Sequence, residues 1–223
     1  GLSVSLSVIG TEGNVLTGNL SGTYPPATYR ISGDLTIADG DTAYLQAGTK
    51  FLFDGGVNFN IYGTLKAIGT ETDSIIFDNY GNDRWRGFTL EDASDETIFK
   101  YVRISGAEKD YGGGMYLVYS NPTLTHVTIA HNTANYGGGM SVNNSNPILT
   151  YVTIAYNTSD YSGGGMHLYY SNPILNHVTI AYNTSGSVGG GIYLSSSNPT
   201  ITHVTISNNT AQGSNGGGMY LAG

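Results

Sequence analysis

The chain has 223 residues and no cysteine, so disulfide bonds cannot stabilise it and its stability must come from packing and stacking. Charged residues are also scarce, at 11% of the chain, and the formal net charge is −8. This balance argues against a nucleic-acid partner, because phosphate binding needs a basic surface. No run of 18 apolar residues and no charged-then-apolar leader is present, which predicts a mature soluble chain without a transmembrane segment.

The scarcity of charge is uneven along the chain. Every Lys and Arg lies at or before Lys109, and after Asp110 the only formally charged side chain is Asp160. The second half is rich in Tyr, Thr, Ser and Asn instead. Surfaces of soluble monomers usually carry more charge than this. An uncharged, tyrosine-rich exterior is more typical of a surface that faces another protein copy or a sugar polymer.

Repetition is the strongest pattern in the second half. The stretch 111–135, YGGGMYLVYSNPTLTHVTIAHNTAN, returns with small changes at 136–160, 161–186 and 188–213, and a fifth copy begins at Gly216. A unit of about 25 residues, rich in Val, Ile, Thr and Tyr, is too short for a helix pair and favours strands. Such repeats indicate a solenoid, in which each unit buries its apolar side chains only against its neighbours.

Two apolar columns define the first strand of each repeat. They lie two residues apart, so both point to the same face of a strand. The first column is Met115, Met140, Met166, Ile192 and Met219, and the second is Leu117, Val142, Leu168, Leu194 and Leu221. A methionine stripe can also mark a metal site or a promiscuous binding face, but the period of two favours a stacked core.

The second half of each repeat predicts two more strands. Its buried residues are Leu124, Val127 and Ile129, and the three-residue step between the first two requires a bend. Proline follows asparagine at Pro122 and its equivalents, which is a turn signal before a strand. At a second corner, recurring asparagines can bond the backbone and one another in a structural ladder. The ladder residues are Asn132, Asn157, Asn183 and Asn209.

These repeats, GGG-φ-x-φ followed by NP-x-φ-xx-V-x-I-xx-N where φ is apolar, resemble those of the pectate-lyase-like superfamily. They are most similar to the right-handed β-helix repeat proteins of bacterial cell surfaces. The resemblance is strong over 111–223 and weaker before it. It implies an all-β fold, the right-handed parallel β-helix or β-solenoid, and a protein that is secreted or held at the cell surface. Many members have polysaccharide ligands.

The first half resembles the leading coils of these proteins, which precede a Trp-Gly motif, here Trp85-Arg-Gly-Phe88. Phe88 and Leu90 align with the two apolar columns, and counting such coils predicts about seven in all. We expect an N-terminal strand with a cap or linker at 1–34, with the turn-rich stretch up to Pro26 as a loop or cap. Irregular leading coils follow at 35–110, and regular repeats of 25–27 residues at 111–223, the last of them incomplete.

Catalytic residue types are missing from the repeats. The resemblance implies that a lyase needs acidic residues for Ca²⁺ and a basic Arg or Lys, whereas a hydrolase needs two or three clustered carboxylates. The outward positions of the methionine strand are Tyr116, Ser141, His167, Tyr193 and Tyr220, with Val118, Asn143, Tyr169 and Ser195 beside them. None is a carboxylate or a strong base. We therefore predict no catalytic residues, no enzyme activity and no cofactor.

An acidic corner loop is the weak candidate for a metal site. Its carboxylates are Glu91, Asp92, Asp95 and Glu96, and Ca²⁺ prefers several carboxylate oxygens. A solvated acidic loop is the commoner result of such a cluster, so we predict no metal.

The histidines also occupy positions that recur from repeat to repeat. His126, His177 and His203 share an outward column with Tyr101 and Tyr151, which favours aromatic stacking between coils over a metal ladder. His131 and His167 are singletons in tyrosine columns, and we interpret them as surface substitutions.

The first candidate function is a structural or adhesive role outside the cell, with the protein as its own partner in head-to-tail filaments. The last repeat stops in mid-coil, and an alternating strand at 2–9, LSVSLSVI, lies at the other end. Open coil ends expose apolar core and unpaired backbone groups, so one subunit's last coil is expected to meet the next subunit's first. A chain cut inside the repeat array explains the open end equally well. The expected contact residues are Leu2, Val4, Leu6, Val8, Met219 and Leu221.

The second candidate function is the binding or cleavage of carbohydrate. Sugar rings would stack on an aromatic face formed by Tyr116, His167, Tyr169, Tyr193 and Tyr220. A fold does not determine a function, and the catalytic residue types are missing.

The third candidate is ice binding on a threonine column. This column has one regular Thr per coil, where a paired-threonine face would be expected. Its members are Thr128, Thr153, Thr179 and Thr205.

Overall fold

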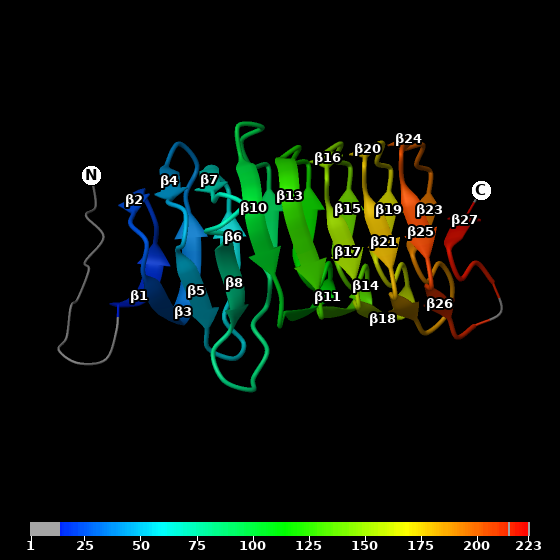
Figure 1. The fold of residues 1–223 in the computed structure, drawn as a ribbon, viewed down its shortest axis with the longest axis horizontal. Coiled ribbons are helices and arrows are strands. Elements are labelled where there is room, and N and C mark those ends of the chain that lie inside the picture. The colour runs from blue at the N-terminus through cyan, green and yellow to red at the C-terminus, as the bar shows by residue number, and fades with distance from the viewer. Residues whose placement is uncertain (1–13, 214, 223) are drawn as a thin grey trace.

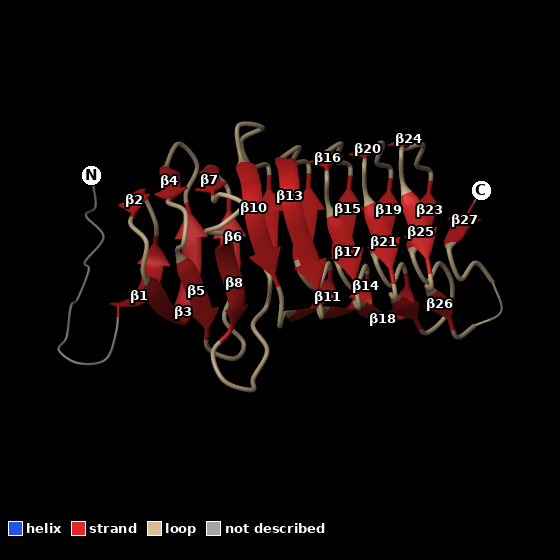
Figure 2. Cartoon of the chain, viewed as in Figure 1, coloured by secondary structure: helices blue, strands red, loops and turns tan. Residues whose placement is uncertain are grey.

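The computed structural model of the chain describes residues 14–213 and 215–222. They form a parallel β-solenoid of about seven turns, with β1 (Asn14–Asn19) and β27 (Met219–Ala222) at opposite ends (Figure 1). The described residues contain strands, turns and loops but no helix (Figure 2). The predicted all-β solenoid of about seven coils is confirmed. Among the described residues we find no helix long and apolar enough to cross a membrane.

The first row of strands carries the methionine column and runs the length of the rod. Met115 pairs with Met140, which pairs with Met166, so identical positions stack from turn to turn. Besides β27, the row consists of β6 (Phe59–Ile61), β9 (Phe88–Glu91), β12 (Met115–Val118), β15 (Met140–Asn143), β19 (Met166–Tyr169) and β23 (Ile192–Ser195).

The second and third rows carry the Leu124 column and the Val127–Ile129 columns. The second row consists of β2 (Gly22–Tyr24), β4 (Thr42–Leu45), β7 (Thr64–Ile68), β16 (Ile148–Thr150), β20 (Ile174–Asn176) and β24 (Thr200–Thr202). The third row consists of β5 (Lys50–Phe53), β8 (Ile75–Asn79), β17 (Thr153–Ala155), β21 (Thr179–Ala181) and β25 (Thr205–Ser207).

Four long strands bend and so belong to two rows each. β10 (Ile98–Ile104) and β13 (Thr123–Ala130) run through the second and third rows, and β1 and β3 (Thr28–Ile37) join the third to the first. A separate narrow sheet forms the fourth row. It consists of β11 (Glu108–Tyr111), β14 (Thr133–Tyr136), β18 (Thr158–Ser162), β22 (Thr184–Ser185) and β26 (Thr210–Ala211).

Corners between the rows are made by residues with positive φ. The bend predicted between Leu124 and Val127 lies at His126, with φ 54°, and recurs one turn later at Tyr151, with φ 55°. A positive φ is uncommon for residues other than glycine. At this corner it reverses the alternation of the strand, so that Leu124 and Val127 both point into the core.

The core fills the inside of the solenoid. Met115, Leu117 and Ile129 are fully buried in the regular turns, as the two-residue period predicts. The leading turns have an aromatic core, in which the rings of Phe53 and Trp85 stack with centroids 4.1 Å apart. Each leading turn buries two or three aromatic side chains, which are large and fill much of the core.

The solenoid begins earlier than the sequence predicts, and the loop or cap expected up to Pro26 is wrong. β1 and β2 lie within that stretch and pair with β3 and β4. Leu16 and Leu20 are buried, but glycines surround them, and Gly18 and Gly22 have positive φ. These glycines bend the chain at corners of the solenoid instead of ending it. The boundary placed at 34/35 falls inside β3, whereas the strand expected at 2–9 lies outside the described residues.

Candidate functional site

A groove of about 410 Å³ lies on the outer face of the first row, a volume typical of small-ligand sites. Its floor runs along the rod through Tyr116, Ser141, His167 and Tyr193, one residue from each of β12, β15, β19 and β23. The wall comes from β11 and β14, which contribute Tyr111 and Tyr136. Asn143, Tyr169 and Ser195 complete the lining at the opposite flank.

The aromatic side chains of the groove stack because the turns are in register. Strands of neighbouring turns lie about 4.8 Å apart, which brings equivalent rings into contact. Tyr111 and Tyr136 stack in the wall with centroids 5.2 Å apart, and His167 and Tyr193 stack in the floor at 4.8 Å. Tyr220 continues the floor, 5.7 Å beyond Tyr193, although it does not line the groove. These contacts hold the rings in fixed orientations.

Ser141 interrupts the aromatic floor between Tyr116 and His167. Its side chain is 2% exposed, so it lies at the bottom of the groove. A serine side chain is much smaller than the rings on either side of it, so it leaves a hollow on the outer face of the strand row. Tyr111 and Tyr136 of the wall border this hollow on one side. The groove therefore arises where one repeat departs from its neighbours.

His167 is more enclosed than a surface substitution would be, so that interpretation is corrected. Its ring lies against Tyr193 in parallel and meets Tyr136 edge-on at 5.5 Å. Nδ1 is buried and has no hydrogen-bond partner in the part of the chain that the structure describes. Burial also lowers the pKa of the imidazole to about 4, because the charged form loses its hydration.

The residues that line the groove include no Asp, Glu, Lys or Arg. A cation lies just beyond its end, where Lys109 Nζ is 5.9 Å from the ring centroid of Tyr116. This ammonium donates to Thr89 Oγ1 and to the carbonyl oxygen of Phe88. Burial, and then the neighbouring charge of Arg86, lower its pKa to about 8. The groove is thus a neutral surface with a single basic group near one end.

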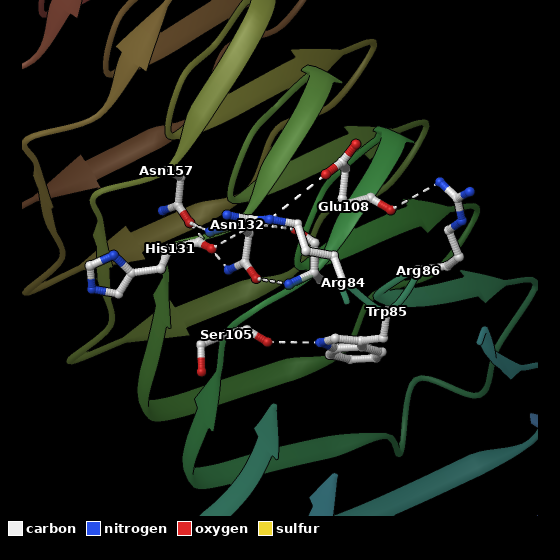
Figure 3. Close-up of polar contacts among 9 residues, drawn as sticks. Arg84, Trp85, Arg86, Ser105, Glu108, His131, Asn132 and Asn157 are labelled. Atoms are coloured by element: carbon white, nitrogen blue, oxygen red, sulfur yellow. Dashed lines mark hydrogen bonds and ion pairs between the residues drawn. The ribbon is translucent and has the colours of Figure 1, made fainter. Parts of the chain in front are cut away.

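Arg84, between β8 and β9, reaches the first regular repeat at His131 (Figure 3). Its Nη1 donates to the carbonyl oxygens of Ala107 and His131, at 3.2 and 3.0 Å, and its Nε lies 3.7 Å from Glu108 Oε2. Trp85 beside it donates from Nε1 to the carbonyl oxygen of Ser105 at 2.7 Å. At the first end of the asparagine column, the backbone N of Ala107 donates to Asn132 Oδ1 at 3.0 Å.

The four ladder asparagines are joined into one hydrogen-bonded column. Asn157 Oδ1 accepts from both the backbone N and Nδ2 of Asn132, at 3.0 and 3.2 Å (Figure 3). Asn183 Oδ1 accepts in the same way from Asn157, and Asn209 Oδ1 from Asn183. Every amide also donates to a backbone carbonyl. Buried amides satisfied in this way have a structural role.

The carboxylates of the acidic corner loop have separate surroundings. Asp95 Oδ1 accepts from Asn121 Nδ2 at 3.0 Å, and Glu96 pairs with Lys66 at 3.4 Å. The other two members, Glu91 and Asp92, are exposed. Among residues 14–213 and 215–222, no group of three or more His, Cys, Asp or Glu side chains is arranged to hold a metal ion.

The outward histidines stack with tyrosines along one corner. Ring centroids are 4.6 Å apart between Tyr101 and His126, 4.9 Å between His126 and Tyr151, and 4.6 Å between His177 and His203. The arrangement is a column of aromatic contacts on the outside of the rod.

Among the described residues, Met219, Leu221 and the threonine column do not line the groove. Leu221 is 69% exposed on β27, and Met219 packs against the core. The expected partners Leu2, Val4, Leu6 and Val8 lie outside the described residues. The threonine column, including Thr128 and its equivalents, pairs in register along the third row.

The sequence interpretation missed the wall of the groove. Tyr111 and Tyr136 stand immediately before the glycine triplets of their repeats. Tyr161 stands one residue further from the triplet of the third repeat. A tyrosine that recurs before the glycine triplets indicates a column of stacked rings. The direction of these tyrosine side chains depends on the fourth row of strands. The sequence pattern does not predict this row, because its strands are only two to five residues long.

Comparison with known proteins identifies one family. The model for a right-handed β-helix region matches residues 67–223, which include the groove and every regular repeat. Searches of the curated proteins and of the solved structures returned no match.

Proposed function

The chain belongs to the right-handed β-helix family, and on this premise we propose that it is a non-enzymatic adhesive protein of the cell exterior that binds polysaccharide in its tyrosine groove. The family includes both enzymes and non-enzymes. The proposal therefore depends on the residues of the groove rather than on the fold. The observation that carries it is a neutral, aromatic groove running along the rod.

The groove suits a sugar chain in shape and in chemistry. Sugar rings offer apolar C–H faces and a rim of hydroxyl groups. The rings of Tyr116 and Tyr193 line the groove and can contact the C–H faces, while Asn143 and Ser195 offer amide and hydroxyl groups to the sugar hydroxyls. Sites of this kind combine apolar lining with a few placed polar groups. Its direction along the rod allows a polymer to extend past both ends.

Binding without cleavage is favoured by the residue types in the groove. Glycoside hydrolysis uses a pair of carboxyl groups, and the lining residues are Tyr, Ser, Asn and His. Ser141 and His167 pair in register, but no hydrogen bond joins their side chains in the described structure. No carboxylate of the lining orients the imidazole, as a serine nucleophile and its base would need.

A polysaccharide panel tests this proposal. The chain is incubated with neutral and uronic-acid polysaccharides, and binding is measured by affinity electrophoresis. We expect retardation by a neutral polymer, and loss of it in Tyr116→Ala and Tyr193→Ala. Tyr156→Ala and Tyr182→Ala are the matched controls, since these two tyrosines stack at 5.1 Å outside the groove. Failure of the unmodified chain to bind any polymer would rule the proposal out.

Head-to-tail self-association is a second candidate function. The observation that favours it is exposed apolar surface on the last described strands, where Leu221 is 69% and Ile201 is 44% exposed. A second copy placed on these strands would cover both side chains and pair their free backbone edges.

Sedimentation velocity across a concentration series tests self-association. We expect the sedimentation coefficient to rise with concentration, and Leu221→Lys to abolish that rise. Thr128→Lys, which adds the same charge to the side of the rod, serves as the control. A constant monomer at every concentration would contradict this second proposal and leave polysaccharide binding unaffected.

A further inference from the structure

His167 differs from every other residue of the groove, because it is the one lining side chain that can present a ring nitrogen. Tyr193 stacks on one side of the imidazole at 4.8 Å, and Tyr136 meets it edge-on at 5.5 Å. Two aromatic neighbours therefore hold the ring in one orientation. A ligand in the groove meets a nitrogen whose position is fixed before binding.

The two ring nitrogens have different surroundings. Among the described residues, Nδ1 is buried and has no hydrogen-bond partner, whereas Nε2 is not buried and makes no hydrogen bond to them. A neutral imidazole has one N–H donor and one acceptor nitrogen. Burying an N–H group without an acceptor is strongly unfavourable, and orphaned buried N–H groups are rarer than orphaned acceptors. The proton therefore belongs on Nε2, the nitrogen that solvent and ligand can reach.

The surroundings also keep this imidazole neutral. The groups packed against it are the tyrosines Tyr136 and Tyr193, and the remaining lining residues carry no formal charge. Burial lowers its pKa to about 4. Lys109, the basic group near Tyr116, belongs to β11 and lies turns away from β19. At neutral pH the groove thus offers an uncharged N–H donor.

We propose that His167 is a specificity-determining residue of the groove, donating from Nε2 to a hydroxyl or ring oxygen of the sugar, and that the uncharged lining around it selects neutral sugars over uronic acids. This inference rests on the proposed polysaccharide binding. A carboxylate entering the groove loses hydration, and no lining cation compensates for the loss. The formal net charge of −8 also repels polyanions before contact. A neutral sugar has no carboxylate to dehydrate and is not repelled by the net charge of the protein.

Two measurements on the whole chain test the inference. In the first, isothermal titration at pH 7 compares a neutral hexasaccharide of the polymer that binds best with a hexauronate. We expect the neutral ligand to bind more tightly. His167→Phe keeps the stacked ring and removes the donor, so its affinity for the neutral ligand should fall roughly tenfold, as for one lost hydrogen bond. His203→Phe, a stacked histidine outside the groove, should bind as the original chain does.

In the second measurement, ¹⁵N spectra of histidine-labelled protein identify the protonated nitrogen of His167 at pH 7. We expect the Nε2–H form, with His167→Phe used to assign the signal. An Nδ1–H signal, unchanged affinity in His167→Phe, or tighter binding of the hexauronate would each overturn the inference. If the original chain binds no saccharide, the proposed function fails and the selectivity with it. The ¹⁵N result still decides the state of the imidazole.

Discussion

At the scale of single residues, stability in this chain comes from polar side chains that repeat their bonds in every turn. Asn157 is fully buried, and its amide takes part in hydrogen bonds to Asn132, Asn183 and the carbonyl oxygen of Ile129. A second column does the same at another corner, where Ser145 Oγ accepts from the backbone N of Ser120. A buried amide or hydroxyl group that loses its hydrogen-bond partner destabilises the fold, because water cannot reach it to replace the bond.

We expect Asn157→Ala to destabilise the fold by about 3 kcal/mol, since it leaves several buried donors and acceptors unsatisfied. Asn135→Ala is the control, because its side chain bonds Asp110 at the surface and should cost less than about 1 kcal/mol. Urea unfolding at neutral pH measures both. Equal effects would show that the column contributes nothing beyond a surface contact.

His167 makes stability depend on pH. Its pKa is lowered from 6.5 to about 4 in the folded chain, so between these values the unfolded chain binds the proton and the folded chain does not. Stability from this group is therefore complete above pH 6.5 and falls as pH decreases toward 4. Unfolding midpoints at pH 7 and pH 4.5 should differ more for the original chain than for His167→Phe. The same difference in both proteins would contradict the burial of this imidazole.

At the scale of elements, the corners decide how the strands are placed. The strand pattern predicts the apolar columns, because a period of two is visible in MYL and in VTI. It does not predict β1 and β2, whose leucines are separated by glycines that bend the chain rather than end it. It predicts the floor of the groove but not its wall, since the direction of Tyr111 and Tyr136 depends on short strands and on stacking between turns.

Corner residues with positive φ provide a test at this scale. His126 has φ 54° and stacks on Tyr101 and Tyr151. His126→Ala loses the stacking and keeps the backbone strain, whereas His126→Gly loses the stacking but relieves the strain. We expect the glycine variant to be more stable than the alanine variant by about 1 kcal/mol, measured by urea unfolding. An alanine variant as stable as the glycine variant would show that this corner is not strained.

At the scale of the whole molecule, most charged side chains and the groove lie in different parts of the rod. The leading turns hold every Lys and Arg and an aromatic core, and Arg84 and Trp85 stand where the asparagine column begins. The later turns are neutral and carry the groove. Because each turn contacts only its neighbours, a single altered repeat, the one with Ser141, can create a site without disturbing the stack.

The most direct test is a crystal structure of the chain soaked with a neutral hexasaccharide. We expect sugar rings to lie along the rod against Tyr116 and Tyr193, with an oxygen within hydrogen-bond distance of His167 Nε2. A saccharide bound on another face of the rod, or an empty groove at saturating concentration, would contradict this expectation.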